Sequence, residues 1–219
     1  VNTTFVDIGG SNPSATLISK RPICNQANFW NIKLKPDGRL YYEAIEGSWP
    51  APYGELVAST INDGQWHHVA VTRSGTTVTI YIDGVQDAQD TSFPLINHSN
   101  TTPLTLGGDV CSPFSWGGYL IGSMDEVRIW SSALSAAQIL ANHNVALTGN
   151  EPGLILYYNM NQGTANGSNP TETTVTDASP NSNNGTLSNF ALNGTTSNWV
   201  GQSIVASPAA ASAASKRCR

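Results

Sequence analysis

Carboxylates, histidines and cysteines are the side chains in this sequence that could do chemistry. Glycoside hydrolysis needs two carboxyl groups that flank the same sugar bond. Glu43 and Glu46 lie three residues apart, and Asp125 and Glu126 are adjacent. On strands the two members of each pair would point to opposite faces. The sequence therefore predicts no catalytic carboxylate pair, and we expect no enzyme activity.

The histidines and cysteines make no stronger case for catalysis. His67 and His68 are adjacent, and the other two histidines are isolated, so the sequence has no spacing typical of a zinc site. The nucleophile motif G-x-S-x-G is absent as well. The three cysteines are Cys24, Cys111 and Cys218. Three cysteines allow one disulfide and leave one thiol.

The composition excludes several classes of partner. The chain has 219 residues, 11% of them charged, and a formal net charge of −5. An acidic chain is not expected to bind nucleic acid or an anionic membrane, and no apolar run approaches the roughly 18 residues of a membrane span. The abundant Asn, Thr, Ser and Gly are typical of extracellular surfaces. The start at Val1 predicts processing or a fragment of a longer chain.

A β-hairpin is predicted between Asn62 and Gln86. Two runs that alternate with period 2 and are rich in Val, Ile, Thr and Tyr flank a short Ser-Gly-Thr turn, which is the pattern of an antiparallel pair. Asp83-Gly84 and Asp63-Gly64 supply tight turns at its ends. With the later strand at 124–130, the hairpin supplies the predicted core: Trp66, Val69, Val71, Val78, Ile80, Ile82, Val127, Ile129 and Trp130.

Two motifs carry a family resemblance. DGQWHHVAVTR followed by TIYIDG resembles the central hairpin of laminin G-like domains, in the concanavalin A-like lectin/glucanase superfamily that includes the pentraxins. GSMDEVRIWSSALSAAQI, at 122–139, resembles the last inner strand and short helix of the same family. The resemblance implies packing and hydrogen-bonding roles for the W-H-H tripeptide and for the D-E pair, whose acid would hold backbone or Arg128.

The predicted fold is an all-β, antiparallel two-sheet jelly-roll sandwich with one short helix. Further strands are expected at 15–18, 28–34, 39–45 and 104–106. Residues 47–56 are predicted to be a loop, because Pro50 and Pro52 cannot donate ladder hydrogen bonds, and 87–103 a polar connection. The helix is expected at 132–142, with Ser135 as its N-cap and Gln138 completing a capping box.

The domain organisation has two interpretations. LILYYNM at 154–160 is a predicted strand, and NGTLSNFAL at 184–192 holds another. We favour a single laminin G-like domain at 1–206, in which the strands of 153–206 complete the sandwich. In the alternative, they begin a second domain. The Ala/Ser-rich end, 207–219, is predicted to be a linker or disordered tail.

The resemblance to pentraxins also implies a rim where two loops meet. It places Asn25, Asn28 and Asp109 at the positions of calcium ligands, although only Asp109 is acidic. Calcium is thus the cofactor that the resemblance suggests. The same arrangement brings together Cys24 and Cys111, which we expect to form a disulfide. That bond would clamp the rim where pentraxins use metal.

Sugar binding usually needs an exposed aromatic ring beside polar groups. The aromatic residues in predicted loops are Trp49, Tyr53, Phe114, Trp116 and Tyr119. We therefore predict a non-catalytic, secreted or cell-surface module for binding and adhesion, with a glycan or a cell-surface protein as partner and other domains beside it in the same chain. The alternatives are a structural stalk or filament domain that contacts protein and, third, a glycan-active enzyme.

Overall fold

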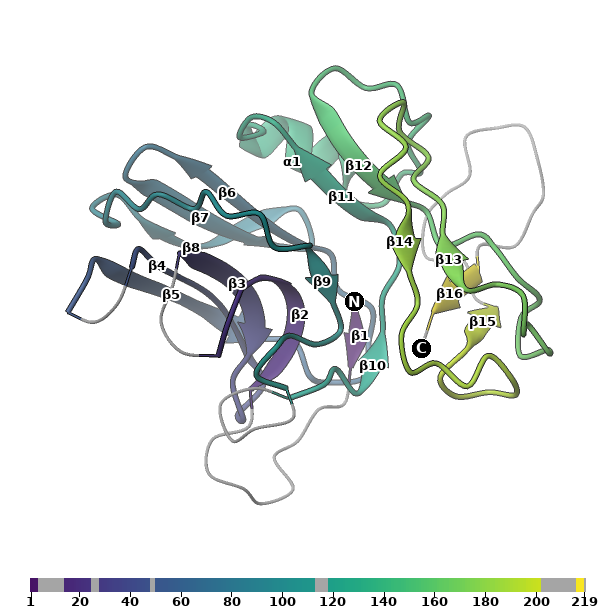
Figure 1. Ribbon diagram of the computed structural model, residues 1–219. Helices are drawn as coiled ribbons and strands as arrows, with labels where there is room; N and C mark the ends of the chain where they lie inside the picture. Colours follow the sequence, from purple (N-terminus) through teal and green to yellow (C-terminus); the bar gives the residue numbers. More distant parts are fainter. Residues whose placement is uncertain (4–13, 25–27, 48–49, 113–117, 202–215, 219) are drawn as a thin grey trace. The chain divides into compact units, whose positions relative to one another are not determined.

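The computed structural model describes residues 1–3, 14–24, 28–47, 50–112, 118–201 and 216–218. These residues form antiparallel sheets and a single short helix (Figure 1), so the all-β prediction is confirmed. The chain divides into two compact units, Asn2–Gly122 and Ser123–Arg219. Val1 belongs to the second of these units. Strands β1 (Asn2–Thr3) and β10 (Gly122–Ser123) lie at the ends of the first unit.

A five-stranded antiparallel sheet dominates the unit Asn2–Gly122. Its strands in spatial order are β5 (Tyr53–Thr60), β4 (Arg39–Ile45), β3 (Phe29–Leu34), β2 (Ala15–Lys20) and β9 (Thr105–Leu106). The positive φ of Gly38, 84°, closes the tight turn between β3 and β4. Tyr53–Thr60 contradicts part of the predicted loop 47–56. Pro50 and Pro52 precede Tyr53, so neither removes a hydrogen-bond donor from β5. In addition, β5 is an edge strand, which pairs on one side only.

A three-stranded sheet completes this unit. It consists of β6 (Val69–Ser74), β7 (Thr77–Ile82) and β8 (Val85–Asp90), in that order. The hairpin β6–β7 confirms the prediction from alternation. Strand β8 was expected to be largely connection, because VQDAQD has almost no apolar face. Its edge position explains how so polar a segment can form a strand.

The predicted core is only partly buried. Val78, Ile80 and Val127 are buried, whereas the other six predicted core residues are half-buried. Three of these six, Trp66, Val69 and Val71, lie on β6 or just before it. Because β6 is the edge strand of its sheet, neighbours cover its side chains on one side only. Alternation predicted the strand but not its position in the sheet.

Phe93 is buried against the five-stranded sheet. Its ring lies 5.5 Å from the ring of Tyr42 on β4. On β5, Gly54 leaves room for it, since a Cβ at that position would lie 2.4 Å from the Phe93 ring. Arg73 of β6 reaches the same ring, with its guanidinium carbon 5.6 Å from the centroid. Aromatic packing therefore joins elements of both sheets on this face.

His98 lies beside this cluster and should make stability depend on pH. Its Nε2 is 2.7 Å from Nη1 of Arg73 and 3.4 Å from the Tyr42 hydroxyl. Burial, and then the Arg73 charge, lower the pKa of His98 to about 4. Between pH 6.5 and pH 4, His98 becomes protonated in the unfolded chain but stays neutral in the folded chain. The free energy of unfolding should therefore fall as the pH drops from 6.5 to 4. We expect a loss of about 2 kcal/mol, allowing for partial solvent exposure.

Urea denaturation at pH 7 and pH 4 measures this loss. His98→Gln is the matched control, since its side chain is neutral at both pH values. The variant should lose less stability than the wild type over the same interval. Equal losses would show that His98 does not cause the pH dependence.

The unit Ser123–Arg219 contains short, paired strands. They are β11 (Val127–Trp130) with β12 (Leu154–Tyr158), β13 (Thr174–Val175) with β14 (Gly185–Thr186), and β15 (Trp199–Gly201) with β16 (Lys216–Cys218). The predicted strand at 154–160 is thus confirmed, and it pairs with β11. Strand β16 falls in the segment predicted to be a linker or tail. Those three residues pair antiparallel with β15.

Helix α1 (Ala136–Asn142) begins as predicted. Ser135 is its N-cap, and the capping box with Gln138 is complete. Arg128 of β11 donates to the Asn142 carbonyl at the end of this helix (2.8 Å) and pairs with Glu126. The expectation that an acid of the D-E pair holds Arg128 is therefore confirmed.

Asp177 organises the segment that follows β12. Its buried carboxylate accepts hydrogen bonds from the backbone N–H groups of Tyr157, Ser179 and Asn183, at 2.9, 2.9 and 2.8 Å. Burial raises the pKa of this group, but the three backbone donors outweigh burial and hold the pKa below its usual value. One acid thus fixes the DASPNSNNG loop against β12.

Candidate functional site

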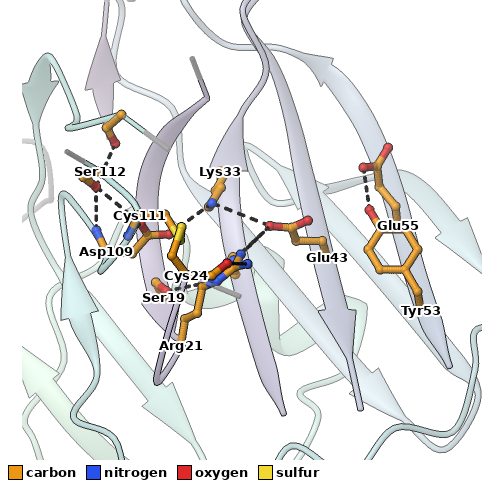
Figure 2. Close-up of polar contacts among 12 residues, drawn as sticks. Ser19, Arg21, Cys24, Lys33, Glu43, Tyr53, Glu55, Asp109, Cys111 and Ser112 are labelled. Atoms are coloured by element: carbon orange, nitrogen blue, oxygen red, sulfur yellow. Dashed lines mark hydrogen bonds and ion pairs between the residues drawn. A yellow bond between two sulfur atoms is a disulfide. The ribbon is translucent and has the colours of Figure 1, made fainter. Parts of the chain in front are cut away.

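The candidate site is one face of the five-stranded sheet, called here the polar face. Ser19 on β2 pairs with Asn31 on β3, Asn31 pairs with Glu43 on β4, and Glu43 pairs with Glu55 on β5. Directly opposed residues project to the same side of a sheet, so these four side chains form a row across four strands. Around this row lie Arg21, Lys33, Tyr53 and Asp109 (Figure 2). Lys35 also pairs with Glu55 of the row.

The centre of the polar face is buried and hydrogen-bonded. Ser19 and Asn31 are both fully buried. The Ser19 hydroxyl donates to Oδ1 of Asn31 (2.5 Å), and Nδ2 of Asn31 donates to Oε1 of Glu43 (2.9 Å). Because both ends of the Asn31 amide are engaged, its orientation is fixed. Glu43 is consequently held in one position.

Cations offset the repulsion between the opposed carboxylates of Glu43 and Glu55. Like charges opposite each other destabilise a sheet. Lys35 donates to Oε1 of Glu55 at 2.8 Å, while Lys33 and Arg21 lie 3.6 and 3.8 Å from Oε1 of Glu43. Each carboxylate is thus neutralised by its own cations.

Arg21 closes the end of the face near the disulfide. Its guanidinium lies 3.9 Å from the centre of the Phe29 ring and donates to the carbonyl oxygens of Ile23 and Cys24, at 3.0 and 2.8 Å. The stacked and hydrogen-bonded side chain ties the loop after β2 to the sheet.

The outer end of the face is open to solvent. Tyr53, on the edge strand β5, is 40% exposed, and its hydroxyl donates to Oε2 of Glu55 at 3.0 Å. Burial, together with the charges of Glu43 and Glu55, raises the pKa of Tyr53 far above its usual value. The phenol therefore stays protonated and keeps donating to Glu55. The partly exposed Tyr53 side chain and the Glu55 carboxylate therefore lie side by side at this end of the face.

The predicted disulfide between Cys24 and Cys111 is confirmed, with the two Cα atoms 5.0 Å apart. It joins the loop after β2 to the loop after β9. Within the second loop, Oδ1 of Asp109 accepts from the Cys111 N–H (2.8 Å), and the Ser112 hydroxyl accepts from the Asp109 N–H (2.7 Å). These bonds place Asp109 at the border of the polar face.

The predicted calcium ligands do not fit a calcium ion. Asn25 lies outside the described residues. Asn28 turns to other partners, since its Oδ1 accepts from the Gly47 N–H at 2.7 Å. Asp109 pairs with the ammonium of Lys33 at 3.0 Å. In the described part of the chain, no three His, Cys, Asp or Glu residues gather in a group that could hold a metal ion.

Of the predicted sugar-binding aromatics, the structure describes Tyr53 and Tyr119, and these two lie apart. Trp49, Phe114 and Trp116 lie outside the described residues. Tyr119 is 56% exposed and lies close to Gly108, where a Cβ would be 2.8 Å from its ring. Gly108 follows β9, whereas Tyr53 lies on β5, and these strands are opposite edges of the sheet. Four strand spacings separate them, about 19 Å.

Other acids and histidines have structural partners. Glu46 accepts from the Asn97 N–H at 2.8 Å, which separates it from Glu43. His67 lies between Asp83 and Asp63, at 2.9 and 3.1 Å, so the hydrogen-bonding role expected for the W-H-H tripeptide is confirmed. Burial lowers the pKa of His67, but the two acids outweigh burial and raise it.

Sequence reasoning missed the pair Glu43 and Glu55 and the cations beside them. The two glutamates lie on adjacent strands, 12 residues apart in sequence, so spacing within one strand does not reveal the pair. One signal was available. Asn31 and Lys33 alternate with apolar residues in the predicted strand 28–34, which indicates a polar row on one face.

The antiparallel sheets define a protein with a concanavalin A-like β-sandwich fold. More particularly, the chain belongs to the Laminin_G_3 family of the concanavalin A-like lectin/glucanases superfamily, which matches residues 3–140. The match ends within helix α1, although β12 beyond it pairs with β11 inside it. The assignment of 1–206 to one domain stays a prediction.

Two solved structures are similar to the chain. A "putative carbohydrate binding protein" from Bacteroides ovatus ATCC 8483 is 22% identical, with a TM-score of 0.57, over 83% of this chain and 48% of that one. The chain thus spans about half the length of that protein. An S-layer domain-containing protein (residues 221–444) from Clostridium thermocellum ATCC 27405 is 24% identical over 59% of this chain and 62% of that one, with a TM-score of 0.32, too low to bear on the fold. No curated protein is significantly similar in sequence.

Proposed function

We propose that the chain is a non-catalytic, extracellular carbohydrate-binding module and that it binds sugar on the polar face at Tyr53. The observation that carries this proposal is the exposed Tyr53 ring hydrogen-bonded to Glu55 at the open end of the face. An aromatic ring can stack on the apolar face of a pyranose, and adjacent carboxylates accept hydrogen bonds from its hydroxyl groups.

Three features support a sugar as the ligand. The ring and the carboxylates lie on β-strands, which hold a binding site more precisely than loops do. The ion pairs around Glu43 and Glu55 fix both acids before a ligand arrives. The similar Bacteroides ovatus structure is that of a "putative carbohydrate binding protein".

The contacts of the two glutamates favour binding over hydrolysis. A glycosidase needs one carboxyl group that keeps its proton for the leaving oxygen. Here Glu55 is paired with Lys35 and Glu43 lies between Arg21 and Lys33, so both are held as partners of cations. Hydrolysis of β-glucans by the pure chain would contradict this part of the proposal.

An extracellular site of action is supported by the disulfide, because such bonds persist in oxidising compartments. In the described residues no helix is long and apolar enough to cross a membrane. A role as an adhesion module of a larger surface protein, beside other domains, fits a chain that spans about half of a similar structure.

A glycan array with and without calcium, followed by calorimetry on the best ligand, tests the proposal. Tyr53→Ala should weaken binding about tenfold, because it removes the stacking ring. Tyr53→Phe is the matched control. It keeps the ring, loses only the hydroxyl, and should retain most of the affinity.

Two results would count against the proposal. If no glycan binds in either condition, a structural stalk or filament domain that contacts protein becomes the better explanation. If a glycan binds equally well to the wild type and to Tyr53→Ala, the site lies elsewhere, and Tyr119 at the opposite edge of the sheet becomes the next residue to replace.

A further inference from the structure

Lys33 is a buried lysine, with only 1% of its side chain exposed. Placing an ammonium in a protein interior is costly unless opposite charges surround it. Lys33 is the next-to-last residue of β3, and alternation directs its side chain to the same face as Asn31. Its burial therefore needs an explanation from its neighbours.

Two carboxylates from different parts of the fold meet at this ammonium (Figure 2). Nζ lies 3.0 Å from Oδ2 of Asp109, whose side chain is also 1% exposed, and 3.6 Å from Oε1 of Glu43. Asp109 belongs to the loop after β9, and Glu43 belongs to β4. Lys33 thus bridges the loop to the sheet.

The contact with Asp109 is electrostatic rather than a well-aligned hydrogen bond. Oδ2 has no hydrogen-bond partner of good geometry in the described residues, although the ammonium is 3.0 Å away. The other oxygen of Asp109 is engaged by the Cys111 N–H. The Lys33 ammonium thus acts as a positive charge between oxygens of two separate elements. A bound metal ion would have the same effect.

The charges of this group already balance. Lys33 and Arg21 supply two positive charges, and Asp109 and Glu43 supply two negative ones. A divalent cation would add charge to a neutral, closed cluster, and the ammonium already lies between the two acids.

We infer that Lys33 is the built-in cation of this site: its ammonium takes the place of a divalent metal ion, so the fold is independent of calcium. Removal of the ammonium should leave two carboxylates that accept a divalent cation in its place. This inference does not rest on the proposed sugar binding, because its test measures thermal stability alone.

The first test uses the wild-type chain. Its melting temperature should be the same in EDTA and in millimolar CaCl2, because no metal is part of the folded state. A wild-type melting temperature that falls by several degrees in EDTA would overturn the inference.

The second test compares two replacements of Lys33. Lys33→Met removes the charge and fills the space, whereas Lys33→Ala removes the charge and opens the space. Both should melt several degrees below the wild type, because a buried Asp109 is left without its partner. CaCl2 should raise the melting temperature of Lys33→Ala in a concentration-dependent way and leave that of Lys33→Met unchanged. NaCl of equal ionic strength is the control for screening.

Three outcomes would contradict the inference. The first is that both variants melt at the wild-type temperature. The second is that Lys33→Ala melts at the same temperature in EDTA and in CaCl2. The third is that calcium raises the melting temperature of Lys33→Met as much as that of Lys33→Ala. If Lys33→Ala does not fold without metal, the double variant Lys33→Ala/Asp109→Asn should fold and ignore calcium. If none of the variants folds, the wild-type comparison in EDTA and CaCl2 decides alone.

Discussion

The Trp199→Ala variant is expected to lose about 3–5 kcal/mol of unfolding free energy, the range for removal of a large aromatic side chain from a core. Trp199 is fully buried in the unit Ser123–Arg219. Its ring packs against Gly163, where a Cβ would lie 2.5 Å from Cδ1. Gly163 has a φ of 66°, so the backbone there is shaped to receive the indole. A small side chain at 199 would leave a cavity that this backbone cannot fill.

Buried amides add to the expected loss. Asn198, also fully buried, donates to the carbonyl oxygens of Gly167 and Gly194 at 2.7 and 2.8 Å, and Asn169 donates to Asn198 at 2.8 Å. The Trp199 ring helps to keep water away from these bonds. Water that enters the cavity would compete for them, so packing and polar contacts should be lost together.

Urea denaturation monitored by circular dichroism measures this loss. Trp130→Ala is the matched control, because the sequence predicted Trp130 to be in the core whereas the structure leaves it half-buried. We expect Trp130→Ala to cost less than Trp199→Ala. The reverse order would mean that Trp199 is not the main aromatic core residue of its unit.

The strands that the sequence predicted are those with a strong alternation of their own. Residues 69–74 and 77–82 have β-branched residues on a regular period, and both became strands. The strands at 53–60 and 85–90 were missed in whole or part. Both are edge strands, which are stabilised by one neighbour and by contacts distant in sequence. Strand β6 is an edge strand too, but it has a regular alternation of its own. The segments 53–60 and 85–90 lack one, so local pattern carries little information about them.

The polar face could not be predicted from local sequence patterns either, because its contacts join residues that are distant in the sequence. Asp109 was expected to be either a calcium ligand or a solvated acid in a turn, and in the structure its buried carboxylate pairs with Lys33. Its partner Lys33 lies 76 residues earlier in the chain, and only the pairing of β2 with β3 and β9 brings the two into contact. The disulfide could be anticipated, because the family resemblance supplied the arrangement of the two loops.

Removal of the Cys24–Cys111 disulfide is expected to lower the unfolding free energy by about 4 kcal/mol. The bond joins residues separated by 87 positions, so it restricts the unfolded chain over a long loop. In the chain-entropy model, the stabilisation grows with the logarithm of loop length. The Cys24→Ala/Cys111→Ala double variant, studied by urea denaturation, measures the effect.

Removal of the disulfide should also change the folded state locally. This effect distinguishes the bond from a crosslink that acts only on the entropy of the unfolded chain. The bond fixes the loop in which Cys111 N–H donates to Asp109, and thereby holds Asp109 opposite Lys33. Loss of the bond should therefore weaken the ion pair between Asp109 and Lys33. Lys33 should then contribute less to the free energy of unfolding in the double variant than in the wild type. Cys218→Ala is the control and should leave stability unchanged, since Cys218 lies outside the bonded pair. Equal stability of the double variant and the wild type, or a non-reducing peptide map that joins Cys24 or Cys111 to Cys218, would show that the clamp on the polar face is not this disulfide.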